Sequence, residues 1–212
     1  MKRVYFISGL GADKRVFSFL DLSFCEPVYV DWIKPVKKES LEGYALRLRE
    51  EIPETNPTIV GISFGGMLAT EMAKADPNVK AILISSNKTA KEFPGYLRIG
   101  RYFPFYKWMP SKMMKNSAYL IKWVFGRNGK EQKKVFLEII RDTDTEFVKW
   151  AIDAILHWKN KEVPGNIIHM HGTADRLLPH RFVKADYIIR GGNHVMPMDS
   201  HEEVSALLKK LV

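Results

Sequence analysis

The sequence alternates between short apolar runs and stretches with the spacing of an amphipathic helix, and this alternation is the strongest constraint on its fold. Six runs rich in β-branched and aromatic residues predict buried strands, at residues 3–9, 27–32, 57–63, 79–86, 165–172 and 185–192. Helical spacing is found at residues 40–52, 65–76 and 200–212. Apolar strands separated by helices are typical of a parallel sheet covered on both faces. We therefore expect an α/β fold.

The alternation stops between residues 87 and 160, where no strand pattern is found. This segment holds 15 Lys and Arg against 7 Asp and Glu, a difference of 15 − 7 = +8, so it carries most of the chain's net charge of +9. Amphipathic helices are predicted within it at residues 111–126, 130–142 and 145–159. The predicted organisation is a core of residues 1–86 and 161–212, interrupted by a helical insertion at 87–160.

Polar residues mark the starts of two predicted core helices. Ser40 precedes the apolar positions of the helix at 40–52 and is expected to cap its first turn. Before the last helix, Ser200 and Glu203 have the spacing of a capping box. Asp199 is interpreted as a further cap of the same helix.

The composition excludes several classes of protein. Apolar residues make up 46% of the chain, which is enough for a sizeable core and unlike a disordered segment. Cys25 is the only cysteine, so we expect no internal disulfide and interpret it as a buried thiol in a reducing compartment. No stretch reaches the roughly 20 apolar residues that a membrane span needs. We therefore predict a soluble, cytoplasmic protein without stable membrane insertion.

The G-I-S-F-G stretch at residues 61–65 lies where a predicted strand meets a predicted helix. A serine hydroxyl is a weak nucleophile unless it is exposed, held in place and next to a base. A sharp turn would expose Ser63, and it requires small residues at the positions where Gly61 and Gly65 stand. The pattern indicates a nucleophile elbow. The alternative is a glycine–serine turn that only joins the two elements.

Two residues near the end of the chain could form a catalytic group with Ser63. Asp175 follows the predicted strand at 165–172, and His194 follows the next one, at 185–192. A nucleophilic serine needs a base, and the base needs a carboxylate that orients it. Because parallel strands end at one edge of a sheet, we expect the three side chains to meet at that edge.

Together these motifs resemble the α/β-hydrolase family. The matching stretches are G-I-S-F-G at 61–65, H-G-T-A-D-R-L-L-P at 171–179 and G-G-N-H at 191–194. The resemblance implies that Ser63 is the nucleophile, His194 the general base and acid, and Asp175 the group that orients His194.

The resemblance also implies the fold. The segments 4–86 and 166–212 fit the family's three-layer α/β/α framework, with a mostly parallel sheet. The chain begins directly with the strand before the first loop, so we expect a sheet reduced to about six strands. The insertion at 87–160 corresponds to a helical cap, or lid, over the site.

Acyl transfer requires backbone N–H groups that stabilise negative charge on the carbonyl oxygen. Phe64, directly after Ser63, is expected to provide one of them. By family resemblance, Leu10 in the loop after the first strand provides the other. Many family members begin this loop with His-Gly, whereas this chain has Ser8 and Gly9.

His169 and His171 alternate on a predicted strand, so their side chains point to one face and could in principle bind a metal ion. No third ligand stands at a convincing spacing, and structural roles are favoured for both. The G-L-G-A-D stretch at 9–13 lacks the second half of a phosphate-binding motif. No cofactor and no metal ion are predicted.

The insertion is rich in aromatic residues, methionines and basic residues. Its apolar side chains would line a substrate pocket or pack the cap onto the sheet, and the candidates are Trp108, Met109, Met113, Met114, Tyr119, Trp123 and Phe125. The basic residues between them would face water or an anionic substrate. Contact with lipid is a further alternative, while nucleic-acid binding is disfavoured by the catalytic motifs.

The sequence therefore predicts a serine hydrolase that cleaves a small-molecule carboxylic ester, thioester or related acyl bond through an acyl-enzyme. The expected partner is a small-molecule acyl substrate, anionic or apolar, with no nucleic acid, and the oligomeric state stays open. The alternatives are a non-catalytic ligand-binding protein or a lyase on the same scaffold.

Overall fold

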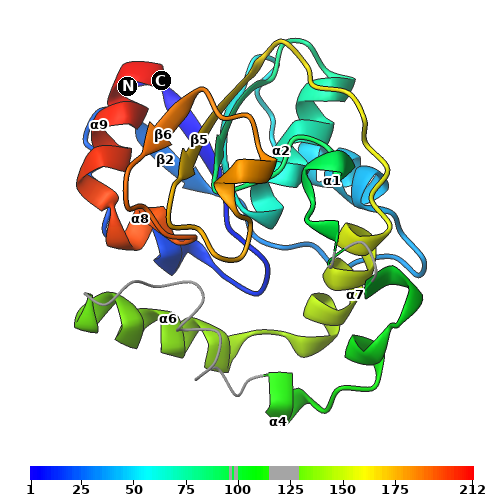
Figure 1. Cartoon of the computed structure of the whole chain (residues 1–212). Coiled ribbons are helices and arrows are strands. Elements are labelled where there is room, and N and C mark those ends of the chain that lie inside the picture. Colours follow the sequence, from blue (N-terminus) through cyan, green and yellow to red (C-terminus); the bar gives the residue numbers. More distant parts are fainter. Residues whose placement is uncertain (96, 98–99, 115–128) are drawn as a thin grey trace.

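A six-stranded parallel sheet forms the centre of the computed structural model, which describes residues 1–95, 97, 100–114 and 129–212, without the side chains of 112 and 113 (Figure 1). The strands are β1 Arg3–Ile7, β2 Glu26–Tyr29, β3 Thr58–Ile62, β4 Lys80–Ile84, β5 Ile167–Gly172 and β6 Tyr187–Ile189. They lie in the order β2-β1-β3-β4-β5-β6, and every neighbouring pair is parallel. The predicted sheet is thereby confirmed.

Helices connect the strands and fill the segment between β4 and β5. The α-helices within the described residues include α1 Leu41–Glu50, α2 Phe64–Ala75, α4 Ser111–Met114, α6 Lys130–Asp142, α7 Thr145–Leu156, α8 Met196–Asp199 and α9 His201–Leu211. Short 3-10 turns are η1 Lys14–Phe17, η2 Ala90–Glu92, η3 Gly100–Tyr102, η4 Phe105–Lys107 and η5 His180–Phe182. Beyond Met114, the helix predicted at 111–126 lies outside the described residues.

Side chains from each strand alternate between two hydrophobic cores on opposite faces of the sheet. On one face, Ile59 and Leu83 pack with residues of α1, α2 and α7. On the other face, Val60 and Ile82 pack with residues of η1, α8 and α9. Helices therefore cover both faces, which confirms the predicted three-layer α/β/α arrangement (Figure 1).

Of the two helix caps predicted from the sequence, the one at Ser40 is present and the one at Ser200 is not. The Ser40 side chain accepts a hydrogen bond from Gly43 N–H at 3.1 Å, so this cap is confirmed. The capping box at Ser200 is wrong, because the Ser200 hydroxyl donates instead to Asp199 Oδ1 at 3.2 Å and makes no cap bond. Asp199 ends α8, whose last turn runs directly into Ser200, so the extended backbone that a capping residue needs does not form there.

The segment 87–160 contains helices and turns but no strand among its described residues. Its helix α7 packs on α1, and Phe147 and Ala151 are buried in the core that α1 and α2 share. Its helix α6 contacts η1, and Val135 and Phe136 pack against the other core. In Figure 1 this segment lies across the side of the molecule that faces the β1–η1 loop and the chain around α8.

The predicted apolar lining of this segment is wrong for Trp108, which is among the exposed large side chains. Met109 and Met114 are half-buried. Tyr119, Trp123 and Phe125 lie outside the described residues, as does the side chain of Met113. Within the part of the chain that the structure describes, no helix combines the length and apolar character of a membrane span.

Tyr44 on α1 provides a test of how the core fixes the chain that precedes this helix. Its buried hydroxyl accepts from Ile33 N–H at 3.1 Å and donates to Ile33 O at 3.0 Å. Tyr44→Phe is expected to lower the free energy of unfolding by about 1–3 kcal/mol, because two buried backbone groups lose their partner. Urea denaturation measures the change. Tyr102→Phe, at an exposed ring, should change stability by less than about 0.5 kcal/mol, and an equal effect of both substitutions would contradict the assignment.

Candidate active site

Ser63 lies between β3 and α2, and its backbone adopts an unusual conformation. Its φ of 52° and ψ of −117° lie in a region that residues with a Cβ rarely occupy, so the turn is strained. Its N–H donates to Ile84 O at 2.9 Å, and its carbonyl accepts from the Ser86 hydroxyl at 2.6 Å. Both bonds tie the turn to the end of β4, and they hold Ser63 at the edge where the strands end.

Close backbone contacts on either side of Ser63 require Gly61 and Gly65. A Cβ at Gly61 would lie 2.4 Å from Gly65 O. A Cβ at Gly65 would lie 2.4 Å from both Ile7 O and Ser8 O. No side chain fits at such distances, so the two glycines permit the turn and let the loop after β1 lie against the start of α2.

Ser63, His194 and Asp175 form a continuous hydrogen-bonded chain. Ser63 Oγ lies 2.9 Å from His194 Nε2, and His194 Nδ1 lies 2.9 Å from Asp175 Oδ2. An ionised carboxylate only accepts, so Nδ1 carries the proton and Nε2 accepts from the Ser63 hydroxyl. The structure thus brings together the three residues selected from the sequence, which follow β3, β5 and β6.

Asp175 is buried, yet its surroundings favour the charged form. Burial alone would raise the pKa of its carboxyl, but the electrostatic interaction and hydrogen bond with His194, the Leu178 N–H and nearby His171 outweigh it. The pKa of Asp175 therefore lies below its ordinary value. Asp175 Oδ1 accepts from Leu177 N–H at 2.9 Å and Leu178 N–H at 2.8 Å, which leaves Oδ2 for His194.

The loops that carry Asp175 and His194 are joined at two glycines. A Cβ at Gly172 would lie 2.1 Å from Gly192 O, and the same carbonyl accepts from Ala174 N–H at 2.9 Å. The sequence showed both glycines but not their contact. Their close approach fixes the separation of the acid-bearing loop from the histidine-bearing loop.

The loop after β1 is braced from within. Ala12 N–H donates to Gly9 O at 3.0 Å, while Ala12 O accepts from both Ser8 Oγ and Trp32 Nε1 at 2.8 Å. Ser8, which stands where many family members have histidine, thus stabilises the loop. A Cβ at Gly9 would lie 3.4 Å from Ser63 Cβ, so the loop borders the serine.

The two N–H groups proposed to hold an oxyanion are those of Leu10 and Phe64. Leu10 follows Gly9 in the braced loop, and Phe64 is the first residue of α2. The N–H of a first helical residue has no acceptor within its own helix. Both groups thus lie on segments that border Ser63, and their role stays a proposal.

The fold and these motifs agree with comparisons to known proteins. The family model described as the alpha/beta hydrolase family matches residues 4–207. The chain belongs to the α/β-hydrolase family. No curated protein matches the sequence.

Solved structures with a similar fold share little sequence with this α/β-hydrolase. A hydrolase from Pseudomonas aeruginosa aligns with a TM-score of 0.79 at 11% identity, covering 99% of this chain and 89% of that one. An esterase from Exiguobacterium antarcticum aligns at 0.76 and 15%, covering 100% and 91%. The enol-lactonase from Burkholderia xenovorans aligns at 0.75 and 15%, covering 99% and 90%. At these identities the likeness shows the fold alone.

In this α/β-hydrolase, two buried histidines on β5 continue the series of polar side-chain contacts behind Asp175. His171 Nε2 lies 2.7 Å from Leu178 O and 3.4 Å from Asp175 Oδ2, and His171 Nδ1 lies 3.2 Å from His169 Nε2. A carbonyl only accepts, so His171 Nε2 carries a proton and His169 Nε2 donates to His171 Nδ1. Burial lowers the pKa of both imidazoles. For His171, the negative charge of Asp175 acts in the opposite direction, but burial outweighs it. Among the described residues, no group of three or more possible ligands could hold a metal ion.

The segment 87–160 holds the loop after β1 through Thr143. The Thr143 hydroxyl lies within hydrogen-bond distance of Gly11 O and Ile139 O, and Arg15 in η1 pairs with Asp142 at 2.8 Å. No sequence pattern marked Thr143, because its partner is 132 positions away. A cavity of about 480 Å³ opens beside this contact, and its lining includes Gly11, Ala12, Trp32, Ile139 and Phe147.

A larger cavity, of about 1050 Å³, lies elsewhere. Its lining includes Leu41, Glu71, Phe93 and Trp158, but not Ser63, His194 or Asp175. Ser63, His194 and Asp175 do not line the 480 Å³ cavity either. That cavity borders the loop that carries Leu10, and it shares Trp32 and Phe147 with the aromatic cluster around Phe64.

Gly65→Ala tests the contact beneath the nucleophile turn. The added Cβ is expected to push away Ile7 O and Ser8 O, lowering the free energy of unfolding by about 1–3 kcal/mol. Catalytic activity should also fall, because the loop that carries Leu10 is displaced. Gly95→Ala is the matched control, since a Cβ there meets nothing within 4 Å. Denaturation curves give the stability of both variants, and initial rates give their activity. Full activity of a folded Gly65→Ala protein would contradict the role assigned to this contact.

The buried histidines predict how stability depends on pH. Their pKa values are lowered in the folded state, so below about pH 6.5 the unfolded chain binds protons that the folded protein does not. The free energy of unfolding should therefore fall as pH drops below that value, by up to about 1.4 kcal/mol per pH unit for each imidazole. His169→Met is expected to reduce this slope between pH 6.5 and 5, measured by urea unfolding. An unaltered slope in His169→Met would refute the prediction.

Proposed function

We propose that this α/β-hydrolase cleaves a small-molecule carboxylic ester or thioester by nucleophilic catalysis at Ser63. The observation that carries the proposal is the hydrogen-bonded chain from Ser63 Oγ through His194 to Asp175, with 2.9 Å at each bond. A serine held at a strained turn, next to an imidazole that a buried carboxylate orients, has the parts that an activated nucleophile requires.

The chemistry would proceed in two halves. Ser63 Oγ attacks the carbonyl carbon while its proton moves to His194 Nε2, and the Leu10 and Phe64 N–H groups stabilise the oxyanion. The protonated His194 then donates that proton to the leaving alcohol or thiol, which leaves an acyl-enzyme. A water molecule repeats the sequence, with His194 as its base, and releases the carboxylic acid and free Ser63.

A substrate with an apolar group that reaches the 480 Å³ cavity beside the Leu10 loop is favoured. The 480 Å³ cavity presents Trp32, Ile33 and Phe147, and two of its acids, Asp13 and Asp142, pair with Arg15. The similar structures include an esterase and an enol-lactonase, which supports acyl-ester chemistry on this fold.

Labelling with a fluorophosphonate is the first test. Wild-type protein is expected to gain one label, and peptide mapping should place it on Ser63. Ser63→Ala and His194→Ala should lose it, whereas the exposed Ser23→Ala should label like wild type. A folded wild-type protein that does not label would refute an activated serine and favour a ligand-binding role.

Steady-state and burst kinetics on short acyl esters and thioesters test the mechanism. Ser63→Ala should lower kcat by about 10³-fold or more, and Asp175→Asn by a similar order, because His194 loses its orienting charge. Circular dichroism confirms that the variants fold. A labelled protein that shows no acylation burst with any ester would point to lyase chemistry instead.

A further inference from the structure

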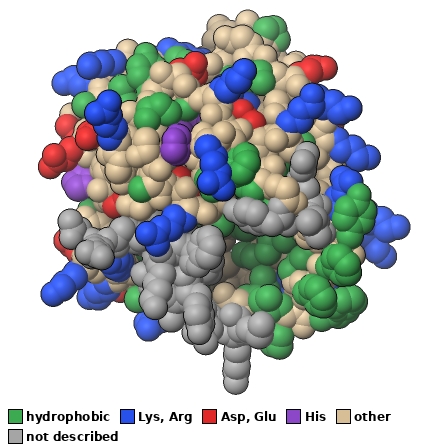
Figure 2. Space-filling model, viewed as in Figure 1, with side chains coloured by type: hydrophobic (Ala, Val, Ile, Leu, Met, Phe, Trp, Pro, Cys, Tyr) green, Lys and Arg blue, Asp and Glu red, His purple; other side chains and the backbone are tan. Residues whose placement is uncertain are grey.

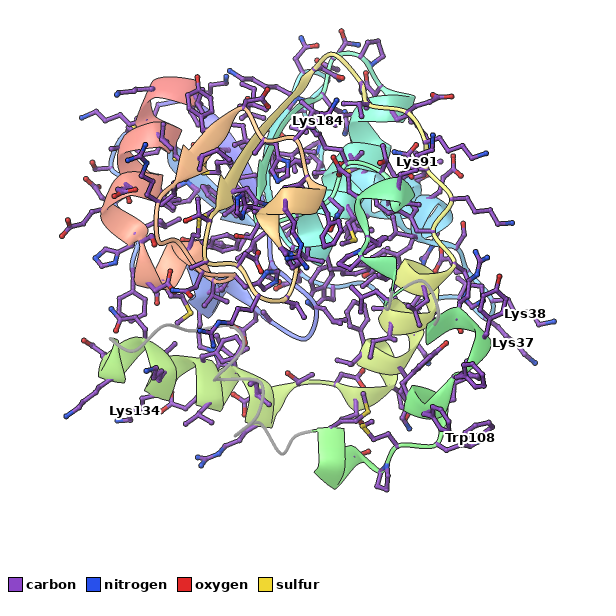
Figure 3. All side chains as sticks on the ribbon, viewed as in Figure 1. Lys37, Lys38, Lys91, Trp108, Lys134 and Lys184 are labelled. Carbon is purple, nitrogen blue, oxygen red and sulfur yellow. The ribbon has the colours of Figure 1, made fainter. Side chains whose placement is uncertain are left out.

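Four large aromatic side chains in residues 101–108 project into solvent. The exposed fractions are 66% for Tyr102, 60% for Phe103, 69% for Phe105 and 74% for Trp108. Figure 2 shows apolar side chains gathered with Lys and Arg along one edge of this face, and Figure 3 shows Trp108 pointing away from the body of the molecule. Single exposed apolar residues are normal, but a cluster of large rings in one short segment marks an interaction surface.

Residues 101–108 are fixed to α7 by Tyr106 and Lys107, and this attachment sets which of their rings face solvent. Tyr106, between the exposed rings, is buried and donates its hydroxyl to Asp153 on α7 at 2.5 Å. Lys107 pairs with Asp153 at 2.8 Å. With Tyr106 held inward against α7, the rings of Phe105 and Trp108 face outward.

Cations without a carboxylate partner lie at the same edge of the molecule as these rings. Arg101 forms a hydrogen bond and a cation–π contact with the neighbouring Tyr102, and the described structure shows no ion pair for Arg101, Lys37 or Lys38. Lys38 and Arg101 line the same cavity of about 1050 Å³, which places the two regions together. Figure 3 shows Lys37 and Lys38 projecting from the same edge as Trp108.

Most acids near these cations are engaged, and Glu162 is the one acid lining the same cavity for which the described structure shows no ion pair. Glu39 pairs with Arg47 at 2.7 Å, Glu42 and Glu71 pair with Lys74, and Asp153 is held by Lys107 and Tyr106. Five cations line that cavity without a carboxylate partner in the described structure, against Glu162 alone, so the unpaired charge beside the rings is positive; they are Lys38, Lys91, Arg101, Lys159 and Lys161.

We propose that residues 101–108, together with Lys37 and Lys38, dock this protein on the surface of an anionic phospholipid bilayer. Tryptophan and tyrosine rings favour the boundary between headgroups and acyl chains, where an apolar body and a polar edge are both satisfied. Lysine and arginine beside them are attracted to anionic headgroups. The docking is peripheral, and it does not depend on the proposed hydrolase activity.

Other partners fit the surface less well. Two copies meeting at this patch would bring Arg101, Lys37 and Lys38 of each against like charges, which disfavours self-association. Base stacking needs free ring faces along a cationic groove, whereas Phe103 and Phe105 stack on each other at 6.3 Å and 8°, and Arg101 covers Tyr102.

Sedimentation with lipid vesicles tests the docking. The 212-residue protein is incubated with vesicles of phosphatidylcholine alone, or of phosphatidylcholine with a minor fraction of phosphatidylglycerol. Binding is expected only with the anionic vesicles, and added salt should weaken it because salt screens the attraction. Equal binding to both vesicle types, or no binding to either, overturns the proposal.

Matched variants assign the binding to the aromatic surface. The triple variant Phe103→Ser, Phe105→Ser and Trp108→Ser is expected to lose binding by more than about tenfold, because it removes three interfacial rings. Lys37→Gln and Lys38→Gln should each weaken it about fivefold. Val163→Ser with Ile188→Ser, at half-exposed apolar side chains outside the segment, should bind like wild type.

Fluorescence supplies a second readout and further outcomes that would overturn the docking. Brominated lipids should quench wild-type tryptophan emission, and Trp108→Phe should remove that quenching. All variants should keep wild-type turnover of a water-soluble ester, so a failure of the hydrolase proposal stays separate. Unchanged vesicle binding by the triple variant refutes bilayer docking. Sedimentation velocity that shows the protein forming a dimer or an RNA complex through this patch also refutes it.

Discussion

The candidate site depends on the close approach of three backbone segments around Ser63. The end of β3, the start of α2 and the loop after β1 meet at distances that only Gly61 and Gly65 allow. Their approach forces the strained φ of Ser63 and places the Ser8–Ala12 loop beside it. The nucleophile turn and the proposed oxyanion donors are therefore one packing arrangement, and neither can be repositioned without the other.

A second set of close contacts holds Asp175 and His194 in place. Gly172 and Gly192 bring the loops after β5 and β6 together, and Asp175 is fixed by backbone N–H groups on one oxygen and His194 on the other. The buried pair His169 and His171 continues this polar column into the core on that face. Because a buried polar group is costly unless it is paired, the column restricts the geometry of Asp175.

The segment between β4 and β5 presents two different surfaces. Its inner side contacts the core through Phe147, and Thr143 holds the loop beside Leu10. Its outer side carries the rings of residues 101–108 among cations. The sequence analysis favoured pocket lining or packing for Trp108 and kept lipid contact as an alternative, whereas the fold anchors Tyr106 and leaves Trp108 facing solvent.

The sequence alone determined the parallel α/β architecture, since apolar runs that alternate with helices can be buried only between helical layers. It also selected Ser63, Asp175 and His194, because residues that follow parallel strands must lie at one edge. Only the tertiary structure decided how these residues are held: the contact of Gly172 with Gly192, the bond of Thr143 to the β1 loop, and the helix α8 that displaced the expected cap at Ser200. Local patterns report which face of an element is buried. They carry no information on which distant backbone it will meet, and that meeting sets the geometry of the site.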